Sequence, residues 1–97
     1  RPKMLLADEG NYRETRFFAI WQKDNEMQDF LLPKSLHHIQ KTTLFGIGLL
    51  QTNDTIIGQE ICEEMWAAEN PSTYLVDDGA EIITNSSGSH HTLRKLD

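Results

Sequence analysis

The stretch from Thr43 to Cys62 reads TLFGIGLLQTNDTIIGQEIC and predicts the central feature of the fold. Two strand-like runs, TLFGIGLLQ and TIIGQEIC, flank the compact turn sequence TND, and this pattern is typical of a β-hairpin. Glycines inside such runs weaken strand propensity and indicate close approach of a neighbouring backbone. These glycines are Gly46, Gly48 and Gly58. We therefore predict a hairpin whose second strand ends at the cysteine.

The segments around the hairpin predict short strands alternating with short helices. The best-defined helix is residues 70–79, where Asn70 can cap the N-terminus, Pro71 suits the first helical position and Gly79 ends the helix. We also expect strands at 2–6 and 80–84, helical turns at 11–21, 63–68 and 92–96, and loops at 22–29 and 85–91, with the segment from residue 30 extended up to Pro33. Strand, helix, strand, loop, helix is the order of an α/β fold.

Composition sets limits on the class of protein. The 97 residues suffice for one domain at most, and 38% hydrophobic with 25% charged residues is typical of a soluble globular chain. The net charge of −6 argues against nucleic-acid binding, and no apolar run has the roughly 20 residues of a membrane span. A single cysteine cannot form an internal disulfide, so a cytoplasmic location is expected.

Cys62 lies where the strand pattern ends and two glutamates follow. A thiol at a strand-to-helix corner can be exposed on a sharp turn beside backbone N–H groups, as in the nucleophile elbow of hydrolases. The alternatives are a thiol that only packs, and glutamates that only form a solvated helix start. Lys3 can likewise be a plain surface lysine. The adjacent pairs His37–His38 and His90–His91 diverge on regular elements, so we predict no metal site.

Three blocks of sequence change this balance when they are taken together. RPKMLLADEGNYRE (1–14), IGQEICEEMW (57–66) and GAEIITNSSGSHHTLRK (79–95) resemble the glutaminase domain of eukaryotic glutamine-dependent NAD synthetases, within the nitrilase or carbon–nitrogen hydrolase superfamily. The resemblance implies part of a nitrilase-type α-β-β-α sandwich. It also implies that residues 1–97 are an internal fragment of a single glutaminase domain, without the general-base segment and the synthetase domain.

The same resemblance implies roles for individual residues. Cys62 matches the nucleophile, Lys3 the catalytic lysine, and Glu14 a second glutamate that supports the lysine. The general-base glutamate of the family lies upstream of Arg1. Ser89 matches a position that contacts bound glutamine. Either Arg94 or Lys95 matches a basic residue near the substrate carboxylate.

The implied function is hydrolysis of the glutamine amide through a cysteine thioester. The ammonia would serve ATP-dependent conversion of deamido-NAD to NAD in a separate synthetase domain, which would use ATP and Mg²⁺; no cofactor is expected in these residues. Expected partners are glutamine, the remainder of the polypeptide and a second copy of the protein. Two alternatives remain open: another nitrilase-superfamily amidase, and a non-catalytic homologue used as an assembly partner.

Three short segments depart from the pattern of the family. AIW replaces the usual TPW at 19–21, LFGIG replaces PFGDA at 44–48, and WAA replaces WTP at 66–68. None of these changes removes a proposed catalytic side chain. We expect them to lie in loops near the site, so a diverged or weakened glutaminase also remains open.

Overall fold

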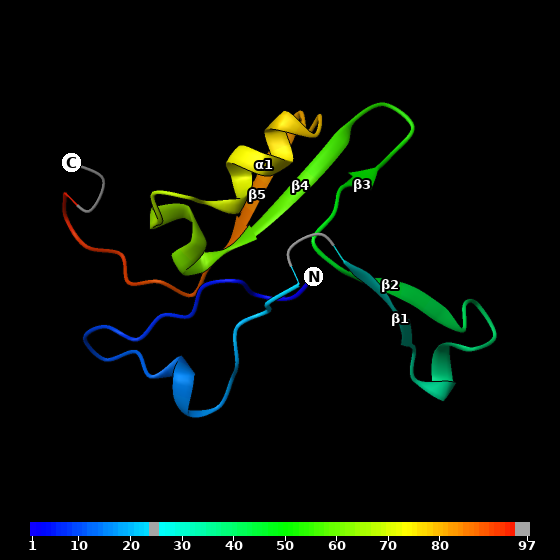
Figure 1. Ribbon diagram of the computed structural model, residues 1–97, viewed down its shortest axis with the longest axis horizontal. Helices are drawn as coiled ribbons and strands as arrows, with labels where there is room; N and C mark the ends of the chain where they lie inside the picture. The colour runs from blue at the N-terminus through cyan, green and yellow to red at the C-terminus, as the bar shows by residue number, and fades with distance from the viewer. Residues whose placement is uncertain (24–25, 95–97) are drawn as a thin grey trace.

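The computed structural model describes residues 1–23 and 26–94. The chain is elongated, with extents of 46 × 34 × 24 Å, and its short elements form two separate sheets (Figure 1). The elements in order are the 3₁₀ helix η1 (Glu14–Arg16), β1 (Met27–Leu31), the 3₁₀ helix η2 (Lys34–Leu36), β2 (Thr42–Gly46), β3 (Leu50–Gln51), β4 (Ile56–Ile61), the 3₁₀ helix η3 (Cys62–Trp66), α1 (Pro71–Asp77) and β5 (Ile82–Ser86).

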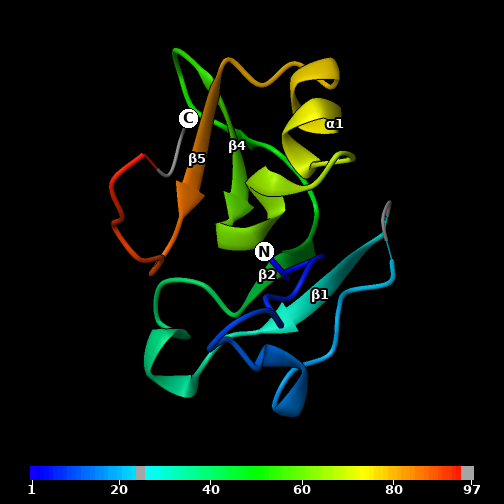
Figure 2. The same cartoon turned by 90° about the vertical axis from the view of Figure 1, so that its left-hand side faces the viewer.

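The larger sheet has the order β3-β4-β5 and contains the parallel pair β4–β5. Parallel neighbours need a crossover connection, and here η3 and α1 provide it. Figure 2 shows α1 lying alongside β4 and β5. The close packing depends on Gly58, because a β-carbon there would lie 3.1 Å from Leu75 Cβ of α1 and 2.7 Å from Ile83 Cδ1 of β5. The predicted α/β class is therefore confirmed by a β-α-β unit.

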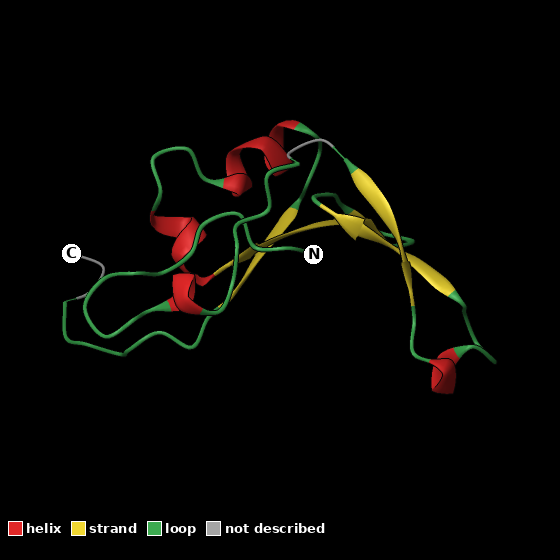
Figure 3. Cartoon of the chain, turned by 60° about the horizontal axis from the view of Figure 1, so that its bottom comes forward, coloured by secondary structure: helices red, strands yellow, loops and turns green. Residues whose placement is uncertain are grey.

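The predicted hairpin is correct only next to its turn. Leu50 pairs with Ile57 and Gln51 with Ile56, around a turn closed by Thr52 and Thr55. The first run does not form one continuous strand, because its residues 43–46 belong to β2 and pair with β1 in the second sheet. Figure 3 shows this two-stranded sheet as an arm that projects from the rest, with η2 at its tip.

Glycine at the end of β2 allows residues 26 and 27 to lie close against it. A β-carbon at Gly46 would lie 2.5 Å from the backbone oxygen of Glu26, and one at Gly48 would collide with the Met27 side chain. The close approach predicted at the glycines is therefore present. The strand that approaches these glycines was not predicted: β1 begins at residue 27, where the sequence analysis expected a loop.

Helix α1 confirms the prediction made from its end signals. Asn70 Oδ1 accepts a hydrogen bond from the Thr73 N–H at 3.1 Å, Pro71 is the first helical residue, and Gly79 has φ +108°. A glycine accepts this left-handed backbone without steric cost, so it ends the helix where the sequence indicated. The two aspartates that precede Gly79 lie at the end of the helix.

Three other local predictions need correction. Residues 2–6 form no strand, since they lie beside the η3 corner without a strand partner. The 11–21 segment has only the single turn η1. Residues 93–94 form a turn, and the rest of the helix predicted at 92–96 lies partly outside the described residues. β5 extends to Ser86, so the predicted loop begins later.

The described part of the chain has a small apolar core. Ala7 and Leu75 are its buried hydrophobic side chains, while large apolar residues such as Phe17, Ile39 and Leu44 are mostly exposed. A sheet of this kind normally buries its faces under further layers. Among the described residues, no helix is long and apolar enough to cross a membrane.

Candidate active site

Cys62 lies at the corner between β4 and η3, and its backbone is left-handed. Its φ is +50°, whereas Ile61 before it is extended at φ −128°. A residue other than glycine, asparagine or aspartate adopts this region at a cost of about 1–2 kcal/mol. Residues held in such a conformation cluster at functional sites. The corner predicted from the sequence is present, and the half-buried cysteine is its first residue.

The end of β5 supports the corner through two side chains. Asn85 Nδ2 donates to the Cys62 backbone oxygen at 3.2 Å and to Glu60 Oε1 at 3.2 Å. Ser87 Oγ donates to Cys62 Sγ at 3.4 Å, and the Ser89 N–H donates to Ser87 Oγ at 3.1 Å. The segment that the sequence assigned to substrate contact therefore reaches the cysteine, and Ser89 is one hydrogen-bonded step from it.

Lys3 forms a close ion pair with Glu14. Lys3 Nζ donates to Glu14 Oε1 at 2.8 Å and to Oε2 at 2.6 Å. Glu14 Oε2 also accepts from the Ala7 N–H at 2.6 Å. The side chains of Lys3 and Glu14 are 15% and 30% exposed, so Lys3 is not a plain surface lysine. The structure thus brings together the lysine and the glutamate to which the resemblance assigned roles.

The environment of Glu14 lowers its pKa. Burial acts in the opposite direction and raises the pKa, but the hydrogen bond from Lys3, the N–H of Ala7 and the charge of Lys3 together outweigh it. The carboxyl is therefore ionised at neutral pH and holds the ammonium by charge as well as by hydrogen bonds.

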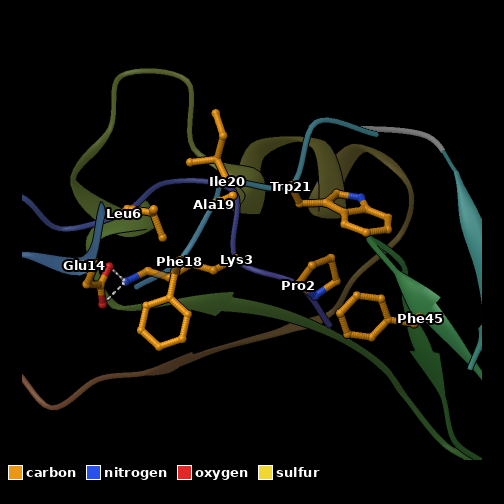
Figure 4. Close-up of a pocket in the computed structure, with 9 residues that line it drawn as sticks. All are labelled: Pro2, Lys3, Leu6, Glu14, Phe18, Ala19, Ile20, Trp21 and Phe45. Atoms are coloured by element: carbon orange, nitrogen blue, oxygen red, sulfur yellow. Dashed lines mark hydrogen bonds and ion pairs between the residues drawn. The ribbon is translucent and has the colours of Figure 1, made fainter. Parts of the chain in front are cut away.

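An open cavity of about 540 Å³ adjoins this ion pair. Figure 4 shows Lys3 and Glu14 at one end of it and the rings of Trp21 and Phe45 at the other. Apart from the ion pair its wall is apolar, and Cys62 is not among its lining residues. Two of the three segments that depart from the family pattern contribute to this wall, namely 19–21 and the phenylalanine of 44–48.

The residue that the sequence interpretation missed is Glu64. Instead of lying in solvent at a helix start, its side chain is 0% exposed. Glu64 Oε2 accepts from the Ile61 N–H at 2.7 Å, and Oε1 accepts from the Met4 N–H at 2.6 Å. Glu64 stands three residues after the N-cap Ile61 and accepts from its N–H, but isoleucine has no side-chain oxygen, so the sequence lacks the Ser or Thr that would mark a capping box.

The predicted site residues thus fall into two groups. Lys3 and Glu14 form one group, and Cys62 and Ser89 belong to the other. Although all four residues are described, no direct hydrogen bond joins Lys3 Nζ to Cys62 Sγ; Glu64 connects the two groups through backbone. Arg94 lies in a turn with φ +61°, and Lys95 lies outside the described residues. Within 1–23 and 26–94, no three His, Cys, Asp or Glu side chains gather as a metal site.

Comparison with known proteins identifies the family to which the chain belongs. The model of the carbon–nitrogen hydrolase family matches residues 1–96. The chain belongs to the carbon–nitrogen hydrolase family. This membership agrees with the fold and the family that the three sequence blocks implied.

Within the carbon–nitrogen hydrolases, the chain is similar to glutamine-dependent NAD(+) synthetases. It is 52% identical to the enzyme of Mus musculus over 97 residues and 48% identical to that of Saccharomyces cerevisiae over 98 residues. These alignments cover 98% and 99% of this chain but 13% and 14% of the relatives. The chain therefore spans about an eighth to a seventh of the length of these relatives.

A solved structure supports the same relationship. A crystal structure of a glutamine-dependent NAD(+) synthetase from Cytophaga hutchinsonii matches with a TM-score of 0.71 and 32% identity, covering 97% of this chain and 13% of the other. The prediction of part of a nitrilase-type α/β fold is thereby confirmed.

Proposed function

We propose that this chain contributes the nucleophile and the oxyanion-stabilising cation of a glutaminase that serves NAD synthesis. Cys62 is the nucleophile, Lys3 stabilises developing negative charge, and Glu14 holds Lys3 in place. The observation that carries the proposal is the left-handed corner at Cys62, in a carbon–nitrogen hydrolase chain that also contains the half-buried Lys3–Glu14 pair.

The proposed reaction begins with a new bond between the Cys62 sulfur and the side-chain amide carbon of glutamine. The carbonyl oxygen becomes an oxyanion, which Lys3 and a backbone N–H after the corner stabilise. The tetrahedral intermediate expels ammonia, whose nitrogen takes up the proton released by the thiol. Water then cleaves the γ-glutamyl thioester to glutamate and restores the thiol. The base for both proton transfers is the family glutamate expected upstream of Arg1.

The structure supports this chemistry by holding each group in place. Ser87 Oγ donates a hydrogen bond to the Cys62 sulfur, and the Asn85 side chain donates one to the Cys62 backbone oxygen. The end of β5 therefore fixes the corner. Ser89 and a basic residue, Arg94 or Lys95, are proposed to bind the α-amino acid end of glutamine. The hydrogen bond from Ser89 to Ser87 leads from that end to the sulfur.

The test uses the complete natural protein that contains these residues. A chloroketone analogue of glutamine should label the wild-type protein on Cys62, and free glutamine should protect the thiol from it. Cys62→Ala should abolish both labelling and ammonia release. A folded wild-type protein that is not labelled and releases no ammonia from glutamine would exclude the proposal.

Substrate and labelling assays on the same protein distinguish the two alternative functions from the proposed one. A different nitrilase-superfamily amidase should hydrolyse other amides faster than glutamine, and its activity should not be coupled to formation of NAD from deamido-NAD. A non-catalytic assembly partner should leave the Cys62 thiol unlabelled but should still copurify with its partner. The identity of 43–52% to NAD(+) synthetases favours the first proposal over both.

The proposal also covers the partners of the site. The ammonia would pass to a synthetase domain of the same polypeptide, where ATP and Mg²⁺ are used, and no residue of this chain is assigned to hold them. We further propose a cytoplasmic homo-oligomer. Size-exclusion chromatography with light scattering on the complete protein tests the oligomer.

A further inference from the structure

Glu64 connects the two halves of the proposed site through one carboxylate. Its Oε1 accepts from the backbone N–H of Met4, the residue after Lys3. Its Oε2 accepts from the backbone N–H of Ile61, the residue before Cys62. Two oxygens of one side chain therefore tie the backbone next to each proposed catalytic residue, across a large separation in sequence.

The carboxylate is also matched in charge. Arg1 Nη2 lies 2.9 Å from Glu64 Oε2 and Arg1 Nη1 donates to Oε1 at 3.2 Å, while the Arg1 side chain is only 7% exposed. A fully buried carboxylate is costly unless it is paired and hydrogen-bonded, and this one receives a cation and two N–H donors. Such a network has one good arrangement, which makes it suitable for fixing the relative position of two segments.

We propose that Glu64 is a positioning residue that sets the place of Lys3 relative to Cys62 for attack on the amide. The inference rests on the proposed glutaminase function. The 1–6 segment has no strand partner and therefore lacks the ladder that would otherwise define its register. Besides Glu64, the ion pair of the Lys3 side chain with Glu14 and a backbone bond between the Trp21 N–H and the Lys3 oxygen at 3.0 Å hold it. Small misplacement of catalytic groups lowers rates steeply, by about 10²-fold for 1 Å.

The decisive variant in the complete protein is Glu64→Gln, which keeps the volume of the side chain. Its amide puts an NH2 donor in place of one of the two oxygens, so one of the two backbone N–H groups loses its acceptor and the bridge between Met4 and Ile61 is broken. We expect kcat for glutamine hydrolysis to fall about 10²-fold with KM nearly unchanged, since the residue does not touch substrate. Glu69→Gln is the matched control, because it removes an exposed carboxylate nearby and should leave kcat unchanged.

A second variant separates positioning from stability. Glu64→Gln leaves the Arg1 cation buried without its partner, which lowers the melting temperature. The double variant Arg1→Met with Glu64→Gln removes that cation, so the melting temperature should recover while kcat stays low. If the double variant recovered both the melting temperature and kcat, or if folded Glu64→Gln kept the wild-type kcat, the positioning role would be overturned but the proposed function would not. A wild-type protein without glutamine hydrolysis would overturn the proposed function as well, so the two failures are distinguishable.

Discussion

The ammonium of Lys3 donates hydrogen bonds to both carboxylate oxygens of Glu14, at 2.8 and 2.6 Å. The two residues belong to an irregular segment and to η1, so the pair, and not a regular element, fixes the lysine side chain. Glu14 is fixed in turn by the Ala7 N–H, and its own N–H donates to the Ala7 oxygen at 3.1 Å. The ion pair is thus part of a small closed network at the edge of the cavity in Figure 4.

Replacing Lys3 by methionine tests the role of the ammonium in catalysis. Methionine keeps the length and the apolar stem but cannot stabilise an oxyanion. We expect kcat for glutamine hydrolysis in the complete protein to fall about 10²–10³-fold, as for loss of one oxyanion donor. Steady-state measurement of ammonia release checks this result.

The control for this variant is Lys34→Met, which removes an exposed lysine of η2 in the arm and should leave turnover unchanged. Full activity of a folded Lys3→Met protein would show that another group stabilises the oxyanion.

The lowered pKa of Glu14 predicts a dependence of stability on pH. Since the folded-state pKa lies below the ordinary value of 4.5, the ionised carboxylate stabilises the fold above that value. This contribution is lost as the pH falls through the folded-state pKa. Wild-type protein should therefore exceed Glu14→Gln in stability at pH 7, and the difference should shrink as the pH falls below about 4.5.

Thermal unfolding of the complete protein between pH 7 and pH 3 measures this difference. Glu9→Gln is the matched control, because Glu9 is exposed in the same segment. It should change the melting temperature little at any of these pH values. A Glu14→Gln difference that grew on acidification would contradict the sign of the shift.

Local signals predicted the elements whose ends are defined by their own residues. Helix α1 follows from Asn70, Pro71 and Gly79, and the turn before β4 follows from TND. The corner at Cys62 follows from the change of pattern after Ile61. The helix and the turn depend on interactions within a few residues, which a sequence displays directly, whereas the corner is also held by Asn85 and Ser87.

Features that depend on distant residues were not predicted. The division of residues 43–51 between two sheets depends on pairing of β2 with β1, and the polar sequence before Phe30 gave no sign of that strand. The burial of Glu64 depends on Met4 and Arg1, about 60 positions away. The proposed roles of Cys62, Lys3 and Ser89 came from the family resemblance, since composition and spacing left open a thiol that only packs.

Gly58 predicts a packing limit between the sheet and α1. Gly58→Ala would place a β-carbon 3.1 Å from Leu75 Cβ, which is close to backbone and cannot move aside. Overpacking of this kind costs about 1–3 kcal/mol, so the melting temperature of the complete protein should fall. Gly88→Ala is the control, because no atom lies within 4 Å of a β-carbon there. Equal melting temperatures for the two variants would mean that α1 does not pack on β4 as described.

The left-handed backbone of Cys62 makes a last prediction, which concerns stability and is independent of catalysis. Glycine tolerates φ +50° and alanine does not, so Cys62→Gly should be more stable than Cys62→Ala by about 1 kcal/mol, although both lack the nucleophile. Ala67, with φ −75°, gives the opposite comparison: there the natural alanine should be more stable than Ala67→Gly. Denaturant unfolding of the four proteins, including the wild type, measures both differences. If alanine were the more stable residue at both positions, the corner would not be left-handed, and the elbow geometry that presents the sulfur would be wrong.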